Sequence, residues 1–331
     1  MKSAMKRNIT GILMILPFLI TCGPAAIAQL SFGKAFHQVM DRADEAYAQE
    51  RYREAGRLYD EALEMKNGRY PLSGYYGDAC KAWVGAREVD RALFYLEKLA
   101  REGWISLEDL NNSHYFDALR EEERWAGILQ IVREKERLYG KPKRRLEQIH
   151  REDQALRQVM GCAKEKFGED SLSLAYFFGL MGRQDSLNLA QVEDIVAEYG
   201  WLAEHKIGDK ANSTLWLVVQ HASLETQEQY LPVIEASVLR GETPPSKLAF
   251  LRDRMAYHRR EKQYYGTQVV QIRETGEYKP YPIADPERVD QRRKEIGLEP
   301  LADYLDFFGI REVTPESLDD DSVLEYLKKQ K

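Results

Sequence analysis

The sequence predicts a mainly α-helical protein, with a short α-helical repeat domain followed by a helical domain that carries a small β-hairpin. Three observations support this prediction. Apolar residues recur at helical spacing in both halves of the chain, small and apolar residues repeat after 37 positions between residues 36 and 102, and residues 269–283 combine β-branched residues with turn residues. Because 331 residues are many for one hydrophobic core, we expect two domains.

The first 28 residues have the features of a signal peptide. Basic residues precede an apolar segment at residues 12–20, and the small-residue sequence Ala-Ile-Ala, which signal peptidase requires, ends at Ala28. We therefore expect cleavage before Gln29 and export, either to the periplasm or out of the cell. The apolar segment is shorter than the roughly 20 residues of a membrane-spanning helix, so we expect no membrane span after its removal. The alternative is lipidation at Cys22, which Thr21 disfavours because a lipobox has Gly or Ala at that position.

Charge and cysteine content restrict the classes of partner. The formal net charge is −6, with both signs interspersed, whereas nonspecific nucleic-acid binding needs a basic face, so we expect no nucleic-acid partner. Cys80 and Cys162 both fall within predicted helices beside apolar residues, which favours buried free thiols over a disulfide. Neither belongs to a C-x-x-C motif, which argues against zinc and redox sites.

Residues 29–140 contain an internal repeat. A degenerate third unit follows the first two at residues 104–129, and Gly85 is expected to mark the turn of the second unit, where the first has Glu50. The spacing resembles tetratricopeptide repeats, whose usual period is about 34 residues, with a longer loop at residues 67–73. This resemblance implies a protein-docking surface, and the alternative is a packing scaffold for the second domain. The paired positions are Ala43 and Cys80, Ala46 and Trp83, Tyr52 and Val89, Ala55 and Ala92, Tyr59 and Leu96, and Ala62 and Leu99.

The second domain is predicted at residues 141–310, followed by an acidic, loosely attached tail at residues 311–331. The boundary is placed in the charge-rich residues 133–145, where Gly140 and Pro142 indicate a helix end and a linker. Periodicity and turn residues then predict helices within 146–163, 189–199, 211–222, 224–239 and 245–255, a buried core helix at 172–181, the hairpin at 269–283, and a helix capped by Asp285 and ended by Gly297.

The second half carries an ordered series of polar motifs. They include Arg151-Glu152-Asp153-Gln154 with Arg157, Asp185 with Asn188, residues 216–222 (WLVVQHA), Asp253-Arg254, Tyr265-Gly266-Thr267-Gln268, and Asp290 with Arg292-Arg293. Together, over about residues 145–305, they resemble the bacterial family catalogued as domain of unknown function 6624. The resemblance implies no established activity, substrate or cofactor. Ser223 departs from the family pattern, which commonly has an acidic residue there, and this weakens any mechanism that relies on a carboxylate at that position.

His221 is the first candidate for a functional residue, because histidine acts as a general base or a metal ligand near neutral pH. The catalytic candidates are His221, Asp253, which could orient the histidine, and Tyr265, which could donate a hydrogen bond. We expect His221 and Gln268 to lie in one cleft. The alternative is that His221 caps its helix and Asp253 belongs to a structural polar network. The candidates for ligand binding are Gln220, His221, Arg254, Tyr265, Gly266, Thr267, Gln268, Asp290 and Arg293.

These residues are not accompanied by a Walker loop, a nucleophile elbow, a zincin helix or a dinucleotide-binding fingerprint. The six histidines are scattered singly, so neither a metal site nor a cofactor is predicted. The sequence therefore favours a noncatalytic binding or interaction module, with a protein partner on the repeats and an unknown small ligand in the second domain. The alternative is an exported enzyme, such as a hydrolase, with its site around His221.

Overall fold

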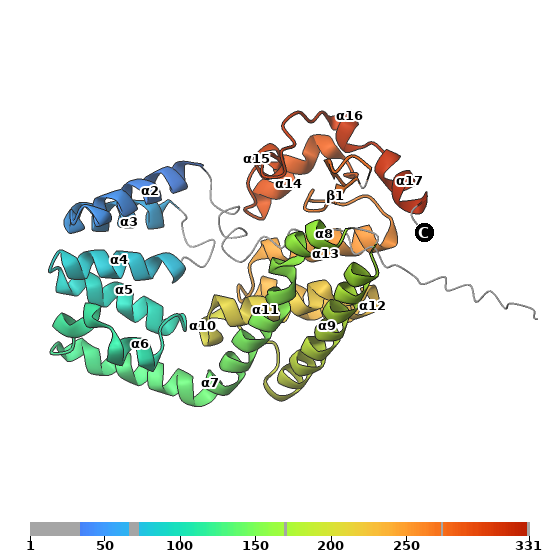
Figure 1. The fold of residues 1–331 in the computed structure, drawn as a ribbon. Helices are drawn as coiled ribbons and strands as arrows, with labels where there is room; N and C mark the ends of the chain where they lie inside the picture. The colour runs from blue at the N-terminus through green and yellow to red at the C-terminus, as the bar shows by residue number, and fades with distance from the viewer. Residues whose placement is uncertain (1–33, 66–72, 169–170, 273, 330–331) are drawn as a thin grey trace, which may run out of the picture.

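The computed structural model describes residues 34–65, 73–168, 171–272 and 274–329 (Figure 1). The expected signal peptide, the cleavage position before Gln29 and the lipidation alternative at Cys22 lie outside the described residues. Within them the chain is mainly helical and has one two-stranded sheet, which confirms the predicted fold class. No helix of this described part is long and apolar enough to cross a bilayer.

The N-terminal part contains two helical hairpins of the same design. Helices α3 and α5 are related by 37 residues at both ends, and the C-terminal ends of α2 and α4 are related by the same offset. Each hairpin turns through a residue in the left-handed conformation, Glu50 in the first and Arg87 in the second, both with φ of 59°. The expectation that Gly85 marks the second turn is therefore wrong, since Gly85 is the last residue of its helix. The four helices are α2 (Lys34–Ala48), α3 (Tyr52–Glu64), α4 (Ser73–Gly85) and α5 (Val89–Arg101).

Glycines allow aromatic rings to contact the helix backbones of these hairpins. A Cβ atom at Gly85 would lie 2.6 Å from the ring of Tyr52, and a Cβ atom at Gly56 would lie 2.6 Å from the ring of Trp83. Any larger side chain would displace the ring, so both positions need glycine for close packing. The role of Gly85 is thus to admit Tyr52 between the two hairpins.

The degenerate third unit consists of short elements that complete the same core. Helix α6 (Leu107–Asn112) begins with a capping box at Ser106, and the 3-10 helix η1 (His114–Leu119) follows it. Buried apolar residues of these elements and of the next helix join the N-terminal core, namely Leu110, Phe116, Leu119, Trp125, Ile128 and Val132.

Helix α7 (Glu123–Gln158) is continuous through the position at which we expected a linker. Gly140 and Pro142 are both buried within it. The charged side chains of this stretch hold the two parts of the chain together, because Lys143 Nζ donates a hydrogen bond to the carbonyl of Gly103 at 2.8 Å and Lys135 Nζ donates to the carbonyl of His205. The linker expectation is therefore wrong, and α7 runs from beneath the repeats into the second part of the chain (Figure 1).

The second part packs around the central helix α11. Leu215 and Val218 face a cluster formed with α7 and α9, whereas Trp216 and Val219 face a cluster formed with α12 and α13. This burial on two sides explains why residues 215–219 are apolar without interruption. The helices are α8 (Met160–Phe167), α9 (Leu172–Tyr199), α10 (Glu204–Ile207), α11 (Asp209–His221), α12 (Leu224–Leu239) and α13 (Pro245–Arg259).

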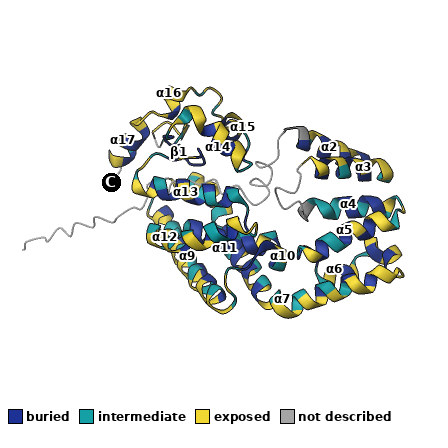
Figure 2. Cartoon of the chain, turned by 180° about the vertical axis from the view of Figure 1, so that it is seen from behind, coloured by how far each residue is buried: buried dark blue, intermediate teal, exposed yellow. Residues whose placement is uncertain are grey.

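The start of α9 departs from the predicted core helix at residues 172–181. Leu174 and Met181 are buried, but Leu172 is 89% exposed and Tyr176 is 65% exposed. Only one face of the helix meets other helices here, so an apolar run does not place all its residues in the core. Figure 2 shows the same division along the described chain, with buried residues on the faces between helices and exposed residues on the outer faces.

The predicted hairpin is confirmed. Strand β1 (Val269–Gln271) pairs antiparallel with β2 (Tyr278–Pro280), with Val270 opposite Lys279. Asp285 does precede the next helix, but it adopts a left-handed conformation with φ of 50° and makes no side-chain cap. The following elements are η2 (Pro286–Arg288), α14 (Val289–Glu295) and α15 (Leu301–Asp306).

The C-terminal tail is attached by apolar packing, contrary to the expectation that it is loose. Leu318 belongs to the core around the hairpin, and Val323, Leu324 and Leu327 pack in a buried cluster with Tyr281 and its neighbours. The tail elements are α16 (Pro315–Leu318) and α17 (Ser322–Lys329).

The two cysteines of the described chain differ in environment. Cys80 is buried between the repeat helices, where its thiol contacts the carbonyl of Ala92 at 3.4 Å. Cys162 is exposed, so the expectation that both are buried is wrong for this residue. Both are free thiols in this structure.

Candidate functional site

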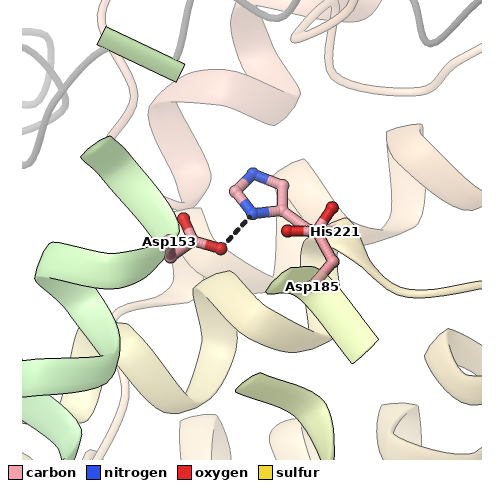
Figure 3. Close-up of side chains that lie close together, drawn as sticks. All are labelled: Asp153, Asp185 and His221. Carbon is pink, nitrogen blue, oxygen red and sulfur yellow. Dashed lines mark hydrogen bonds and ion pairs between the residues drawn. The ribbon is translucent and has the colours of Figure 1, made fainter. Parts of the chain in front are cut away.

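A cluster of charged side chains lies where the ends of α7 and α11 meet the middle of α9. Asp153 and Arg157 occupy positions i and i+4 of α7 and therefore share one face of that helix. Asp185 extends from α9, and His221 is the last residue of α11. Figure 3 shows the imidazole of His221 directed toward the carboxylate of Asp153, with Asp185 beside it.

Short polar contacts connect these side chains. His221 Nδ1 lies 2.9 Å from Asp153 Oδ1. Arg157 Nη1 donates to Asp153 Oδ1 at 3.2 Å, and its Nη2 donates to the two oxygens of Asp185 at 2.8 and 2.9 Å. Gln154 Nε2 donates to the second oxygen of Asp153 at 2.7 Å. The carboxylate of Asp153 is thus fixed by three side chains at once.

The two carboxyl groups differ in their affinity for protons. Burial raises the pKa of Asp153, but the charges of His221 and Arg157 outweigh burial and hold the pKa below its ordinary value. For Asp185 the balance is reversed, because burial raises its pKa by more than Arg157 and His221 lower it. Asp153 is therefore held as a carboxylate, whereas Asp185 takes up a proton more readily than an ordinary aspartate.

The contact with Asp153 determines which nitrogen of His221 is available for chemistry. With Nδ1 donating its proton to the carboxylate, Nε2 carries the lone pair of the neutral ring. No described residue forms a hydrogen bond with Nε2, and the His221 side chain is 5% exposed. An imidazole oriented by a carboxylate in this way can accept a proton at Nε2 from a bound molecule.

Two buried polar atoms on α9 and α11 have no hydrogen-bond partner among the described residues. These atoms are Asn188 Nδ2 and Gln220 Oε1. Asn188 lies one turn of α9 from Asp185, and Gln220 directly precedes His221. Because a buried polar atom without a partner loses the hydrogen bonds it would make in water, such atoms indicate a place for a bound polar molecule.

The same three side chains can be considered as a metal site. Ligand atoms of Asp153, Asp185 and His221 lie within 4.8 Å of one another. However, the guanidinium of Arg157 contacts both carboxylates and supplies the positive charge that a cation would otherwise provide. The cluster therefore fits proton transfer better than metal binding.

Asp253 has a different role from the one expected. Its carboxylate accepts hydrogen bonds from the backbone N–H groups of Tyr264, Tyr265 and Thr267 at 2.7, 3.0 and 3.0 Å, and from Thr267 Oγ1 at 3.0 Å. The carboxylate that orients His221 is thus Asp153, and the expectation that Asp253 does so is wrong. Asp253 instead fixes the loop that follows α13.

Most of the other predicted ligand-binding residues stabilise the same loop. Arg293 donates to the carbonyls of Tyr265 and Glu299, both at 2.7 Å. Asp290 accepts from the N–H group of Leu301 at 2.7 Å. Arg293 thus holds a backbone group of the loop, and Asp290 holds the start of α15.

The remaining residues of the loop are also held from within. Gly266 has φ of 73°, and a Cβ atom there would lie 2.7 Å from Leu301, so packing explains this glycine. Gln268 Nε2 donates to Thr267 Oγ1 at 3.1 Å. No hydrogen bond joins Gln268 to His221 among the described residues, so their contacts do not support the expected common cleft.

Arg254 and Gln220 are the predicted residues that remain candidates beside His221. The side chain of Arg254 is buried, and neither its Nε nor its Nη1 atom has a hydrogen-bond partner among the described residues. Gln220 Nε2 donates to the carbonyl of Phe250 at 3.3 Å, which leaves its oxygen free of partners.

Sequence reasoning did not include Asp153, Arg157 and Asp185 among the candidate site residues. The spacing of Asp153 and Arg157 was a usable signal, because positions i and i+4 of a helix with opposite charges lie on one face. Asp185 offered no such signal, since it approaches Arg157 only when α7 and α9 pack together.

Residues 143–311 match the model of a family of unknown function, DUF6624. Comparison with curated proteins and with solved structures gave no match. The matched residues include every member of the charged cluster and the loop held by Asp253, and they exclude the helical repeats. Since the match spans about half of the sequence, the chain belongs to the family of unknown function DUF6624.

Proposed function

We propose that the second part of the chain is a hydrolytic enzyme in which His221 is the general base. The observation that supports this proposal is the 2.9 Å contact of His221 Nδ1 with the buried Asp153, which leaves Nε2 without a partner among the described residues. This reverses the preference drawn from the sequence, in which a noncatalytic module came first and the enzyme second.

In this proposal Nε2 of His221 takes a proton from a water molecule as the water attacks the substrate. Asp153 accepts hydrogen bonds from Arg157 and Gln154, so its carboxylate is in place to stabilise the imidazolium that forms. The imidazolium of His221 then gives this proton to the leaving group, while Asp185 accepts hydrogen bonds from Arg157 through both of its oxygens. Arg157 keeps the two carboxyl groups in place through its contacts with both.

The proposal is tested by measuring hydrolysis of a panel of chromogenic carboxylic esters, phosphate esters and glycosides by the purified full chain. We expect any activity found to fall by a factor of about 100 or more in His221→Gln, because general-base catalysis contributes about that much. His205→Gln is the matched control, since His205 is exposed and lies outside the cluster. Activity that persists in His221→Gln while the control behaves as the wild type contradicts the proposal.

A second function, protein docking, is favoured by a hollow on the repeats. Its volume is about 610 Å³, and it is lined by α2, α3, α4 and the segment around η1. Three tyrosines and a lysine provide apolar area and hydrogen-bonding groups, namely Tyr47, Tyr52, Tyr115 and Lys81. We propose that this hollow holds a segment of a partner protein, as the likeness to tetratricopeptide repeats implies.

Docking is tested by affinity capture with the full chain and with Tyr115→Ala. Tyr115 is 50% exposed, so its truncation removes contact area with little effect on the core. Leu138→Ala is the control, because Leu138 is exposed to a similar extent but lies away from the hollow. We expect the partner to be lost only with Tyr115→Ala. Equal capture by all three proteins contradicts this second function.

We also propose that the chain is exported, on the support of its basic start, short apolar segment and Ala-Ile-Ala sequence. Intact-mass measurement of the natively expressed protein should give an N-terminus at Gln29. A lipid mass on Cys22 would instead place the protein at a membrane surface.

A further inference from the structure

Arg254 on α13 is a buried cation that lacks an anionic partner among the described residues. Its side chain is 2% exposed, and its Nε and Nη1 atoms make no hydrogen bond. The group it faces is the ring of Tyr257, whose centroid lies 5.8 Å from the guanidinium carbon. A cation–π contact offsets only part of the free energy lost when a guanidinium leaves water, so an anion is the expected complement.

The charges around Arg254 strengthen this argument. Burial lowers the pKa of Arg254 to about 10, and the charged neighbour that lowers it further is another cation, Arg157. Burial together with Arg254 and Arg260 lowers the pKa of His258 to about 4. Burial and the charge of Arg157 therefore both act against the charged form of Arg254, whereas Arg157 itself is paired with Asp153 and Asp185.

A second group of unpartnered polar atoms lies on the same aromatic ring. The guanidinium carbon of Arg260 is 5.4 Å from the centroid of Tyr257, and its Nη1 atom is buried without a hydrogen-bond partner. The hydroxyl of Tyr281, whose ring centroid is 5.0 Å from that of Tyr257, is also buried without one. All of these atoms can donate hydrogen bonds, which is the property that a ligand oxyanion requires of its partners.

We propose that Arg254 binds an oxyanion, a phosphate or carboxylate group, carried by the molecule on which His221 acts. The assignment to that molecule rests on the proposed function. Arg254 is near His221 through helix packing, because Met255 of α13 and Val219 of α11 belong to one buried cluster and α11 ends at His221. A guanidinium suits this task because its planar donors match the two oxygens of a carboxylate or phosphate group.

The test uses the full chain and two probes, inorganic phosphate and acetate, each titrated at constant ionic strength while thermal unfolding and binding heat are measured. We expect one of the two anions to raise the Tm in a saturable manner. Phosphate acting more strongly identifies a phosphoryl group as the ligand chemistry, and acetate acting more strongly identifies a carboxylate. Absence of saturable stabilisation by either anion overturns the proposal.

Two variants of α13 separate a binding role from a structural one. Arg254→Gln should weaken anion binding by at least about tenfold and raise the Tm of the anion-free protein, because it removes a buried unpaired charge. Arg259→Gln is the matched control, since Arg259 is on the same helix, is exposed and pairs with Glu228, and it should bind as the wild type does. A lower Tm with unchanged anion binding in Arg254→Gln shows that the arginine only packs on Tyr257 and overturns the proposal.

Two further variants complete the design. If Arg254→Gln does not fold, Arg254→Lys decides, because lysine keeps the charge but lacks the planar fork, so unchanged binding by this variant overturns the proposal. His221→Gln should bind the anion as the wild type does. The turnover assay thus tests the proposed hydrolytic function, and the anion titration tests the Arg254 site, so failure of either proposal can be recognised separately.

Discussion

Replacing Asp153 by asparagine tests the charged cluster most directly. The change keeps the shape of the side chain and removes its negative charge. It affects three contacts, the 2.9 Å contact with His221 Nδ1, the 3.2 Å contact with Arg157 Nη1 and the 2.7 Å contact with Gln154 Nε2. Since the side chain of Asp153 is 1% exposed, solvent cannot replace these contacts without rearrangement.

The loss of unfolding free energy in Asp153→Asn depends on which contacts of Arg157 remain. Removing one member of a buried ion pair costs about 3–5 kcal/mol when the other charge is left alone. Here Arg157 keeps Asp185, with contacts at 2.8 and 2.9 Å, so its charge stays compensated. The loss should then approach that of one charge-assisted hydrogen bond and part of a second, about 2–3 kcal/mol.

The pH dependence of this loss has a definite sign. The pKa of Asp153 is lowered on folding because the effects of His221 and Arg157 outweigh the opposing effect of burial. The pairing of Asp153 therefore stabilises the protein fully above the unfolded pKa of about 3.8, and this stabilisation is lost as the pH falls through the folded pKa. The difference in unfolding free energy between wild type and Asp153→Asn should therefore be largest near neutral pH and decrease as the pH falls below about 3.8.

Urea unfolding followed by circular dichroism, at neutral pH and at a series of acidic pH values, measures both quantities. Glu134→Gln is the control, because Glu134 lies on the same helix in an exposed pair with Arg137 and should change the stability by less than about 0.5 kcal/mol. If Asp153→Asn is as stable as the wild type at neutral pH, the cluster does not hold these helices together and the reasoning fails.

Three further changes test the fold around the site. Gly85→Ala should lower the unfolding free energy by about 1–3 kcal/mol, because its Cβ atom would lie 2.6 Å from the Tyr52 ring. Gly77→Ala is the control and should leave the stability unchanged or raise it, because no atom lies within 4 Å of its Cβ position. Equal Tm values for the two variants would contradict the packing argument. Asp253→Asn should cost about 3 kcal/mol in urea unfolding, since an amide cannot accept all the hydrogen bonds of the carboxylate, and an unchanged midpoint would refute this role. Leu327→Ala should cost about 2–3 kcal/mol and loosen the tail toward proteolysis, and unchanged protease resistance would show that the tail packing contributes little.

Local patterns were sufficient to predict the helices and the repeat. The 37-residue offset could be read because each hairpin repeats its own small and large residues, and the structure shows the same offset in helix ends and in the left-handed residues Glu50 and Arg87. The turn residue itself could not be predicted from glycine content. Gly85 is needed for packing against Tyr52, whereas a non-glycine residue takes the left-handed position.

The continuity of α7 is where local signals failed. Gly140 and Pro142 are ordinary helix-ending signals, and Pro142 removes one N–H group from the helix interior. The helix continues because contacts distant in sequence hold it, including the hydrogen bond of Lys143 to the carbonyl of Gly103. Tertiary contacts of this kind leave no periodic pattern that could be read from the chain.

The candidate site also depends on tertiary contacts that the sequence does not reveal. His221 was identifiable because histidine acts as a base or a metal ligand near neutral pH, and Arg254 because it belongs to the Asp253-Arg254 motif. The carboxylate that orients His221 lies 68 residues away in sequence, so only the packing of α11 against α7 selects Asp153 over Asp253. The carboxylate of Asp253 instead accepts hydrogen bonds from the backbone N–H groups of Tyr264 and Tyr265 in the adjacent loop.

The position of Asp153 on α7 relates the repeats to the candidate site. The first half of this helix contributes Trp125, Ile128 and Val132 to the core of the repeats, and the second half contributes Leu146 and Ile149 to the core around α11. The catalytic carboxylate of the proposed mechanism follows one turn later on the same continuous helix. Because a helix keeps its residues in fixed register, the repeats help to determine where Asp153 stands relative to His221. A cut at residue 140 would therefore leave each core with its own apolar residues but would remove the helical support of the site, and the full chain is the form in which catalysis and docking should both be measured.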